Sequence, residues 1–219
     1  MKITGILVKK VTPFLAALAV VLVGCSTGIK GDGVVVTTNI TVSQFSSLEA
    51  SGAYTIQWAS GTPALSITTD QNLLPFITTK VTGGSLEIDQ QQNLRPTKGI
   101  MIIVSSPALK DVRLNGASSL TASNVSGQEL KLESNGASSI HVDGSVTNLE
   151  VNFSGAGSLS ATALQARTAR VTLNGAASAD VTASESLEIS ISGACSVTYG
   201  GRPKSVQQEV SGAGKIRAR

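Results

Sequence analysis

Aromatic side chains and charges are scarce in this chain. Aromatic residues make up 3% of the 219 residues and charged residues 14%, against roughly 25% charged in an average soluble protein. Any core must therefore be built from Val, Ile, Leu and Ala, which dominate the 41% hydrophobic share. Abundant aliphatic residues with few charges argue against intrinsic disorder. The shortage of Glu and Lys argues against a long helical bundle.

Cysteine is equally scarce, with only Cys25 and Cys195. Residues 1–10 contain three lysines and no acid, and residues 11–23 are almost wholly apolar, which is the pattern of a secretory signal. The apolar run is shorter than the roughly 20 residues that a transmembrane helix needs. The sequence from Leu22 to Cys25, Leu-Val-Gly-Cys, resembles the lipobox of bacterial lipoproteins. This resemblance implies cleavage before Cys25, lipidation of its sulfur and a membrane partner through that anchor.

The basic character of the chain belongs to this first segment. Three of the 17 basic residues lie in residues 1–24, so the remaining chain has 14 basic and 14 acidic residues and no net charge. A neutral chain lacks the basic surface that binds nucleic acid, so we expect no nucleic-acid partner. With Cys25 lipidated, Cys195 has no partner for a disulfide, and packing and hydrogen bonds must hold the exported protein together.

A short motif of Asn or Ser followed by Gly-Ala repeats six times in the second half of the chain. Successive anchor glycines are separated by nearly equal intervals of roughly 19 residues, as in a repeat architecture. They are Gly116, Gly136, Gly155, Gly175, Gly193 and Gly212. Apolar and polar residues alternate around each anchor, as in Val112, Leu114 and Leu120 against Arg113 and Asn115, which predicts strands with one buried face.

Two short strands and two turns in about 19 residues are the size of one coil of a β-solenoid. Glycine at each anchor accepts a positive φ without steric cost, so we expect these residues at the turns. Stacked hairpins with Asn-Gly turns are the competing interpretation, because Asn-Gly also favours type I′ turns.

The first half of the chain is less regular and contains four of the six aromatic residues that follow the signal segment. Ser51-Gly52-Ala53 is an isolated early copy of the turn motif, and residues 93–98 are a candidate loop. We expect this half to cap one end of the stack. Its predicted strands are Val34–Thr38, Phe45–Leu48, Tyr54–Trp58, Leu65–Thr69, Phe76–Val81, Leu86–Asp89 and Ile100–Ser105.

The run Asn72-Leu-Leu-Pro-Phe-Ile77, the segment Leu86-Glu-Ile-Asp89 and the serial Gly-Ala turns resemble the putative auto-transporter adhesin head GIN domain family of bacterial envelope proteins. The resemblance covers roughly residues 45–216, although Ala follows each anchor glycine here where the family usually has Ser. It implies a right-handed parallel β-helix similar to that of pectate lyases but without their catalytic residues. The predicted organisation is a signal peptide (1–24), lipidated Cys25 with a linker or first strand (25–44), an N-terminal β region (45–108) and repeats (109–219).

No residue pattern predicts catalysis or metal binding. His141 lies on the polar side of its strand, and no acid or cysteine is spaced to share a metal with it. Cys195 occupies a position held elsewhere by Ser118, Ser138, Gly157, Ala177 and Gly214, which indicates a small buried residue rather than a reactive thiol. The acids Glu133, Asp143, Glu150 and Glu188 are interpreted as scattered over different coils and columns, with Asp180 and Glu185 as turn residues. Asn115, Asn135 and Asn174 are interpreted as a structural ladder.

These patterns predict an exported, lipid-anchored, non-catalytic protein of the cell envelope, at the outer membrane, that serves adhesion or surface interaction without a cofactor. The ligand, protein or glycan, and the oligomeric state remain open at this point. Two alternatives also remain: a polysaccharide-active enzyme on a pectate-lyase-like β-helix, which would need an acidic or basic cleft, and an accessory protein of envelope assembly or sensing.

Overall fold

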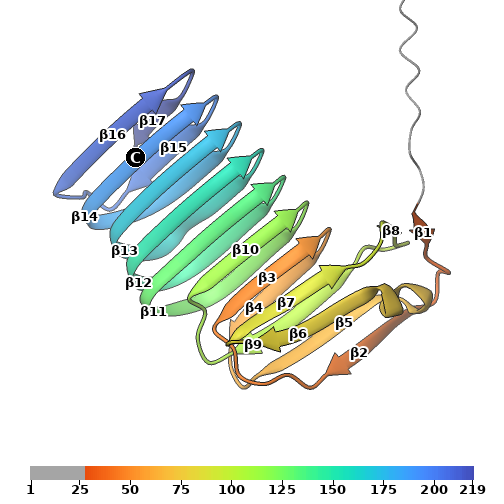
Figure 1. The fold of residues 1–219 in the computed structure, drawn as a ribbon. Coiled ribbons are helices and arrows are strands. Elements are labelled where there is room, and N and C mark those ends of the chain that lie inside the picture. Colours follow the sequence, from red (N-terminus) through yellow and green to blue (C-terminus); the bar gives the residue numbers. More distant parts are fainter. Residues whose placement is uncertain (1–27) are drawn as a thin grey trace, which may run out of the picture.

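The computed structural model describes residues 28–219 and is nearly all β, with 72% strand and 3% helix. Its C-terminal region is a β-solenoid of about five turns (Figure 1). The solenoid strands are β3 (Ser47–Gly52), β4 (Thr55–Ser60), β10 (Asp111–Gly116), β11 (Ser119–Gly136), β12 (Ser139–Gly155), β13 (Ser158–Gly175), β14 (Ser178–Gly193), β15 (Ser196–Gly200), β16 (Ser205–Ser211) and β17 (Lys215–Ala218). The continuous parallel pairing from coil to coil confirms the solenoid and excludes stacked hairpins.

Each coil contributes one strand segment before its anchor glycine and one after it. The segments before the glycines pair in parallel as one sheet, which runs from β3 through β10 to β16. The segments after the glycines pair as a second sheet, which runs from β4 to β17. Alternate side chains of both sheets meet between them and form one continuous core.

The anchor glycines form a column along one edge of the stack. All seven have φ between +104° and +151°, and they are Gly52, Gly116, Gly136, Gly155, Gly175, Gly193 and Gly212. A Cβ on Gly155 would lie 2.4 Å from the carbonyl oxygen of Gly136, and the same close approach recurs at each step of the column. Two separate constraints therefore require glycine at these turns: the positive φ, and the close approach of the neighbouring coil's carbonyl oxygen, which leaves no room for a Cβ.

Gly52 is the first member of this column rather than an isolated copy. β10 pairs with β3 so that Gly116 lies beside Gly52, although the two glycines are far apart in sequence. β4 pairs with the start of β11 in the same way. The solenoid therefore begins at β3, earlier than the boundary at residue 109 that the sequence predicted. The segment between β4 and β10 folds back to form most of the cap, and β2, which precedes β3, completes it.

The cap extends both sheets at the end of the stack where β3 and β4 lie. The hairpin of β6 and β7 continues the first sheet, and β9, β5 and β2 continue the second sheet. The cap elements are β2 (Val35–Ile40), β5 (Ala64–Asp70), a 3₁₀ helix η1 (Gln71–Phe76), β6 (Ile77–Thr82), β7 (Ser85–Gln90) and β9 (Met101–Ser106). Two short strands, β1 (Ile29–Lys30) and β8 (Leu94–Arg95), pair beside them, so the predicted loop at 93–98 contains β8.

The first coil, where β3 and β4 meet the cap, contains large side chains that the later repeats mostly lack. Phe45, Tyr54 and Trp58 are each 2% exposed, and the Trp58 indole donates a 2.9 Å hydrogen bond to the hydroxyl of Ser106. Within the repeats, a large core side chain is accommodated beside a small one. Phe153 is 1% exposed and fits because Gly157 leaves room for its ring, since a Cβ there would lie 2.9 Å from it.

A buried carboxylate ties the cap to the start of the described chain. Asp70, at the end of β5, is 0% exposed. Its oxygens accept hydrogen bonds from the backbone N–H of Gly33 and from the N–H and hydroxyl of Thr97, at 2.7–2.8 Å. These hydrogen bonds, led by that from the Thr97 N–H, lower the pKa of Asp70 and keep it charged.

Candidate binding faces

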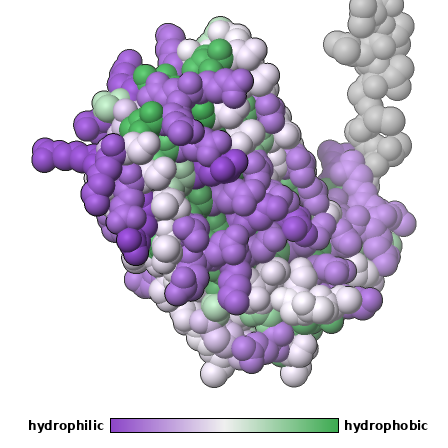
Figure 2. Space-filling view, turned by 60° about the vertical axis from the view of Figure 1, so that its left-hand side comes forward, coloured by the Kyte–Doolittle hydropathy of each residue, from purple (hydrophilic) through white to green (hydrophobic). Residues whose placement is uncertain are grey.

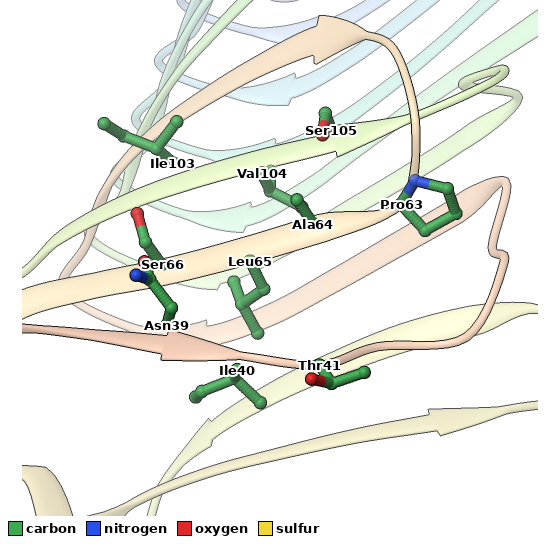
Figure 3. Close-up of a pocket in the computed structure, with 10 residues that line it drawn as sticks. All are labelled: Asn39, Ile40, Thr41, Pro63, Ala64, Leu65, Ser66, Ile103, Val104 and Ser105. Atoms are coloured by element: carbon green, nitrogen blue, oxygen red, sulfur yellow. The ribbon is translucent and has the colours of Figure 1, made fainter.

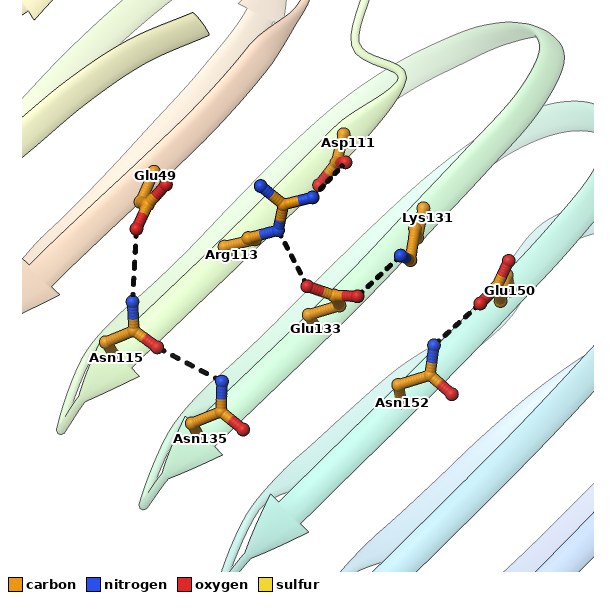
Figure 4. Close-up of polar contacts among 9 residues, drawn as sticks. All are labelled: Glu49, Asp111, Arg113, Asn115, Lys131, Glu133, Asn135, Glu150 and Asn152. Atoms are coloured by element: carbon orange, nitrogen blue, oxygen red, sulfur yellow. Dashed lines mark hydrogen bonds and ion pairs between the residues drawn. The ribbon is translucent and has the colours of Figure 1, made fainter.

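The alternation of side chains gives the solenoid two outward faces of different chemistry. The outward side chains of the first sheet form a charged face, and those of the second sheet form a hydroxyl face. Figure 4 shows part of the charged face, where acidic, basic and amide side chains of neighbouring strands contact one another. The two faces are the surfaces that the fold offers to a ligand.

The charged face contains a row in which the sign of the charge alternates from coil to coil. Parallel pairing places five residues side by side in the order Asp111, Lys131, Glu150, Arg170 and Glu188. A second row begins with Glu49, Arg113 and Glu133. The interpretation that the acids lie in different columns is therefore wrong for Glu150 and Glu188, which share a column with a base between them. The spacing of the anchor glycines was the signal that would have shown it.

Ion pairs connect these rows. Glu133 accepts from Lys131 at 2.6 Å and from Arg113 at 2.7 Å, and Arg113 also contacts Asp111 at 3.1 Å. The hydrogen bond from Lys131, followed by that from Arg113, lowers the pKa of Glu133. Burial raises the pKa of Asp111, and Arg113 opposes this rise. Within the first row, Arg170 contacts Glu188 at 2.8 Å. Most of these carboxylates face a base rather than a second carboxylate.

The asparagines of this face form a shorter ladder than predicted. Asn135 donates a 3.2 Å hydrogen bond to the side-chain oxygen of Asn115, and the side-chain nitrogen of Asn115 in turn donates a 3.4 Å hydrogen bond to Glu49. Asn174 is not in contact with them, because the intervening coil places Ser154 in the column. The ladder therefore stabilises the first coils only.

The hydroxyl face contains two rows of small polar side chains. Ser119, Ser139, Ser158, Ser178 and Ser196 are adjacent in parallel register and exposed. The next row is Thr121, His141, Ser160, Asp180 and Thr198. His141 is exposed between Thr121 and Ser160, as predicted for a surface residue. Apart from His141, Asp180 is the only acidic or basic side chain in these two rows before β17 begins.

The hydroxyl face continues onto the cap, where it is hollowed. A groove of about 360 Å³ lies over β2, β5 and β9 (Figure 3). A second depression adjoins it over β4, β9 and β11 and shares Ile103, Val104 and Ser105 with it. Ile103 is 50% exposed between the two, and Met101 beside it on β9 is 41% exposed. No charged side chain lines either depression. This hollow was not expected from the sequence, because no motif is shared by the residues that line it.

Other candidate residues have structural roles. Cys195 is 2% exposed, and its sulfur lies 3.5 Å from the carbonyl oxygen of Gly175, which confirms the expected small buried residue. Within residues 28–219, no group of three or more His, Cys, Asp or Glu side chains is close enough to hold a metal ion. Cys25, the predicted lipidation site, lies outside the described residues. No helix in the described part of the chain is long and apolar enough to cross a membrane.

Comparison with known proteins finds solved structures of similar fold and a matching protein family. The structure is similar to that of a putative adhesin from Bacteroides fragilis, with a TM-score of 0.72 and 19% identity over 88% of this chain and 100% of that one. It is also similar to a putative adhesin from Parabacteroides merdae (TM-score 0.58, 20% identity, 88% and 99% covered) and to a putative lipid binding protein from Parabacteroides distasonis (0.52, 24%, 87% and 99%). No curated protein matches the chain. Residues 44–203 match the family described as putative auto-transporter adhesin, head GIN domain, and the chain belongs to that family.

Proposed function

We propose that this protein is a non-catalytic, lipid-anchored module of the bacterial cell envelope that binds an uncharged protein or glycan surface through its hydroxyl face. The observation that carries the proposal is the continuity of that face: a row of exposed serines, from Ser196 on β15 to Ser119 on β11, leads toward an uncharged hollow around Ile103. The family, whose description is that of an adhesin, supports a role in surface interaction.

The chemistry of the hollow suits a neutral ligand with both apolar and polar groups. Ile103 offers an apolar contact, and the hydroxyl groups of Ser66 and Thr121 lie around it as hydrogen-bond partners. The Ser105 hydroxyl donates a 2.6 Å hydrogen bond to the Thr62 carbonyl oxygen and can still accept one from a ligand. A charged ligand would lose its hydration there without gaining a counter-charge. Many weak contacts along a rigid face add through avidity when several copies are fixed to one surface.

The charged face supports the non-catalytic part of the proposal. Glycoside hydrolysis needs two carboxyl groups about 5–10 Å apart on either side of one bond. On this face Glu133 and Glu188 are engaged by bases, and Lys131 and Arg170 lie on either side of Glu150 in its row. Catalytic groups must converge on one reacting centre, whereas these side chains are distributed along a flat sheet in alternating sign.

The anchor predicted at Cys25 favours a location in the envelope. Lipidation of Cys25 would attach the chain shortly before residue 28 in the sequence, where the described fold begins with β1. Several acyl chains hold a soluble domain at a bilayer where one is marginal. We place the protein at the outer membrane, with the solenoid projecting from it.

Binding of residues 28–219 to a neutral glycan array and to intact bacterial cells tests this proposal. The buried core residues of the described chain all lie between Phe45 and Val197, well inside this fragment. Ile103→Glu places a charge in the hollow and should abolish binding, whereas Asn174→Glu on the charged face is the matched control and should leave it unchanged. Binding that Ile103→Glu leaves intact, or that is lost only in the Asn174→Glu variant, would contradict the proposal. Cleavage of a polysaccharide by the unmodified fragment would favour the enzyme alternative.

A further inference from the structure

The far end of the solenoid has an open edge with an unusual sequence. β16 pairs with β14 on one side, and no strand among residues 28–219 pairs with its other side. Every residue of β16 is exposed, including Val206 at 36% and Val210 at 45%. In register these two valines continue the columns of Leu187 and Ile191, which are buried. Figure 2, with this end of the stack brought forward, shows hydrophobic surface among hydrophilic side chains there.

The sequence of β16, Ser-Val-Gln-Gln-Glu-Val-Ser, is nearly the same in both directions about Gln208. If two copies pair antiparallel about this residue, Val206 faces Val210 of the other copy and Gln208 faces its own counterpart. Gln207 then faces Glu209, and the two terminal serines face each other. Apolar residues thus meet apolar residues, and polar residues meet polar ones, on the correct sides of the strand.

The backbone of β16 is oriented for this pairing. In a parallel ladder, residues alternate between bonding to one neighbouring strand and to the other. The Lys131 N–H donates to the carbonyl oxygen of Lys110 in the preceding coil. Residues in the same row have the same backbone orientation, and the row of Lys131 ends at Gln207. The N–H and C=O groups of Gln207 therefore point to β14, whereas those of Val206, Gln208 and Val210 point to the open edge. Antiparallel pairing about Gln208 makes these three the hydrogen-bonded positions.

We propose that the protein forms a two-fold dimer in which β16 of each copy pairs with β16 of the other. A two-fold interface requires a self-complementary surface, and β16 is self-complementary in its side chains and in its free backbone groups. The polar Gln208, which replaces the Ile189 of the preceding coil in a buried column, meets its counterpart at the axis. The pairing removes an unprotected edge that would otherwise invite irregular association.

The dimer has a consequence that rests on the proposed lipid anchor. β1, which follows the anchor, lies at the cap end, and β16 lies at the opposite end of the molecule (Figure 1). Dimerisation therefore places the two cap ends, and the two anchors, on opposite sides of the assembly. Two copies that are anchored to facing membranes can pair end to end in this arrangement. The partner of the β16 end is then a second copy on the facing membrane.

The charge of this end gives the dimer a distinctive response to salt. Arg202, Lys204, Lys215, Arg217 and Arg219 outnumber the single acid Glu209 in the segment 202–219. The two-fold axis brings the β17 strands of both copies to the same junction, where their exposed Lys215 and Arg217 repel one another. Added salt screens this repulsion, so the dimer should tighten as ionic strength rises, whereas association through opposite charges would weaken.

Sedimentation of residues 28–219 from about 1 μM to about 1 mM tests the dimer. Gln208→Pro removes an N–H that points to the open edge and should weaken the dimer at least about 10-fold, because the edge is where proline fits a sheet. Gln207→Pro, the matched control, removes an N–H that points to β14 and should lower the melting temperature. A monomer at every concentration, or a dimer that Gln208→Pro leaves intact, would overturn the proposal.

Substitution of Gln207 by charged residues tests the register. Gln207→Lys places two Lys–Glu209 pairs across the junction and should lower the dissociation constant roughly 2- to 30-fold, whereas Gln207→Glu places like charges opposite and should raise it. An equal effect of both variants, or the reverse order, would refute pairing about Gln208. These measurements are independent of ligand binding at Ile103, so the dimer and the proposed function can fail separately.

Discussion

Substitution of Gly155 by Ala measures how strongly the glycine column holds the coils at their separation. Gly155 has φ +119°, and the added Cβ would lie 2.4 Å from the carbonyl oxygen of Gly136. That oxygen is fixed, because it accepts a 2.8 Å hydrogen bond from the N–H of Ala156. The unfavourable φ costs about 1–3 kcal/mol and the displacement of packed backbone a further 1–3 or so. We therefore expect a loss of about 2–6 kcal/mol, or at least about 4 °C in melting temperature.

Thermal unfolding followed by circular dichroism measures the total loss, and hydrogen exchange at the Ala156 amide reports the local opening. Gly99→Ala is the matched control, since Gly99 has φ +85° but no heavy atom within 4 Å of a new Cβ. It isolates the cost of the positive φ. Gly61→Ala has neither a positive φ nor a contact closer than 3.5 Å and should be neutral or slightly stabilising. If Gly155→Ala destabilises no more than Gly99→Ala, the close approach of the coils does not constrain the column.

Four further substitutions have expected outcomes. Asp70→Asn should destabilise the cap. Because the pKa of Asp70 is lowered in the folded state, its carboxylate stabilises the fold at pH values above its unfolded pKa of about 4, and this stabilisation is lost as the pH falls through the folded pKa. The melting temperatures of variant and parent should therefore converge in acid. Tyr54→Phe should be neutral or stabilising in urea unfolding, because the Tyr54 hydroxyl is buried with no hydrogen-bond partner among the described residues. Cys195→Ala should change the melting temperature little, since Ala177 occupies the same column, and the native thiol should resist a thiol reagent until the protein unfolds. Cys25→Ser should release the protein from the membrane fraction or stop its processing, and a processed variant that still sediments with membranes would refute the lipid anchor.

The regularity of the repeats made the solenoid predictable from the sequence. Glycines at nearly equal spacing, with alternation around each, indicated both the turns and the buried faces. The same spacing also predicts the row of Asp111, Lys131 and Glu150, because each of these residues lies five positions before an anchor glycine. The row is missed when the acids are considered one by one. It is found only when the coils are aligned on their anchor glycines, which give the register between strands.

The cap was predictable as strands but not as an arrangement. Its alternating segments correspond to β2, β5, β6, β7 and β9 within a few residues. The contact of Gly52 with Gly116 depends on the return of the chain after the whole cap insertion, which no local pattern encodes. The role of Asp70 likewise depends on Gly33 and Thr97, which are distant in sequence. The hollow around Ile103 arises where three cap strands meet the solenoid, so its residues carry no shared motif.

The alternating row on the charged face constrains how this protein can change its length. The backbone repeats after every coil, whereas the charge pattern repeats after every second coil. Loss of the coil that contains Glu150 would bring Lys131 beside Arg170, and gain of one coil would create a similar conflict. Loss or gain of two coils preserves both the glycine column and the alternation. Shorter and longer solenoids derived from this one should therefore differ by even numbers of coils, unless the charges of the row are changed as well.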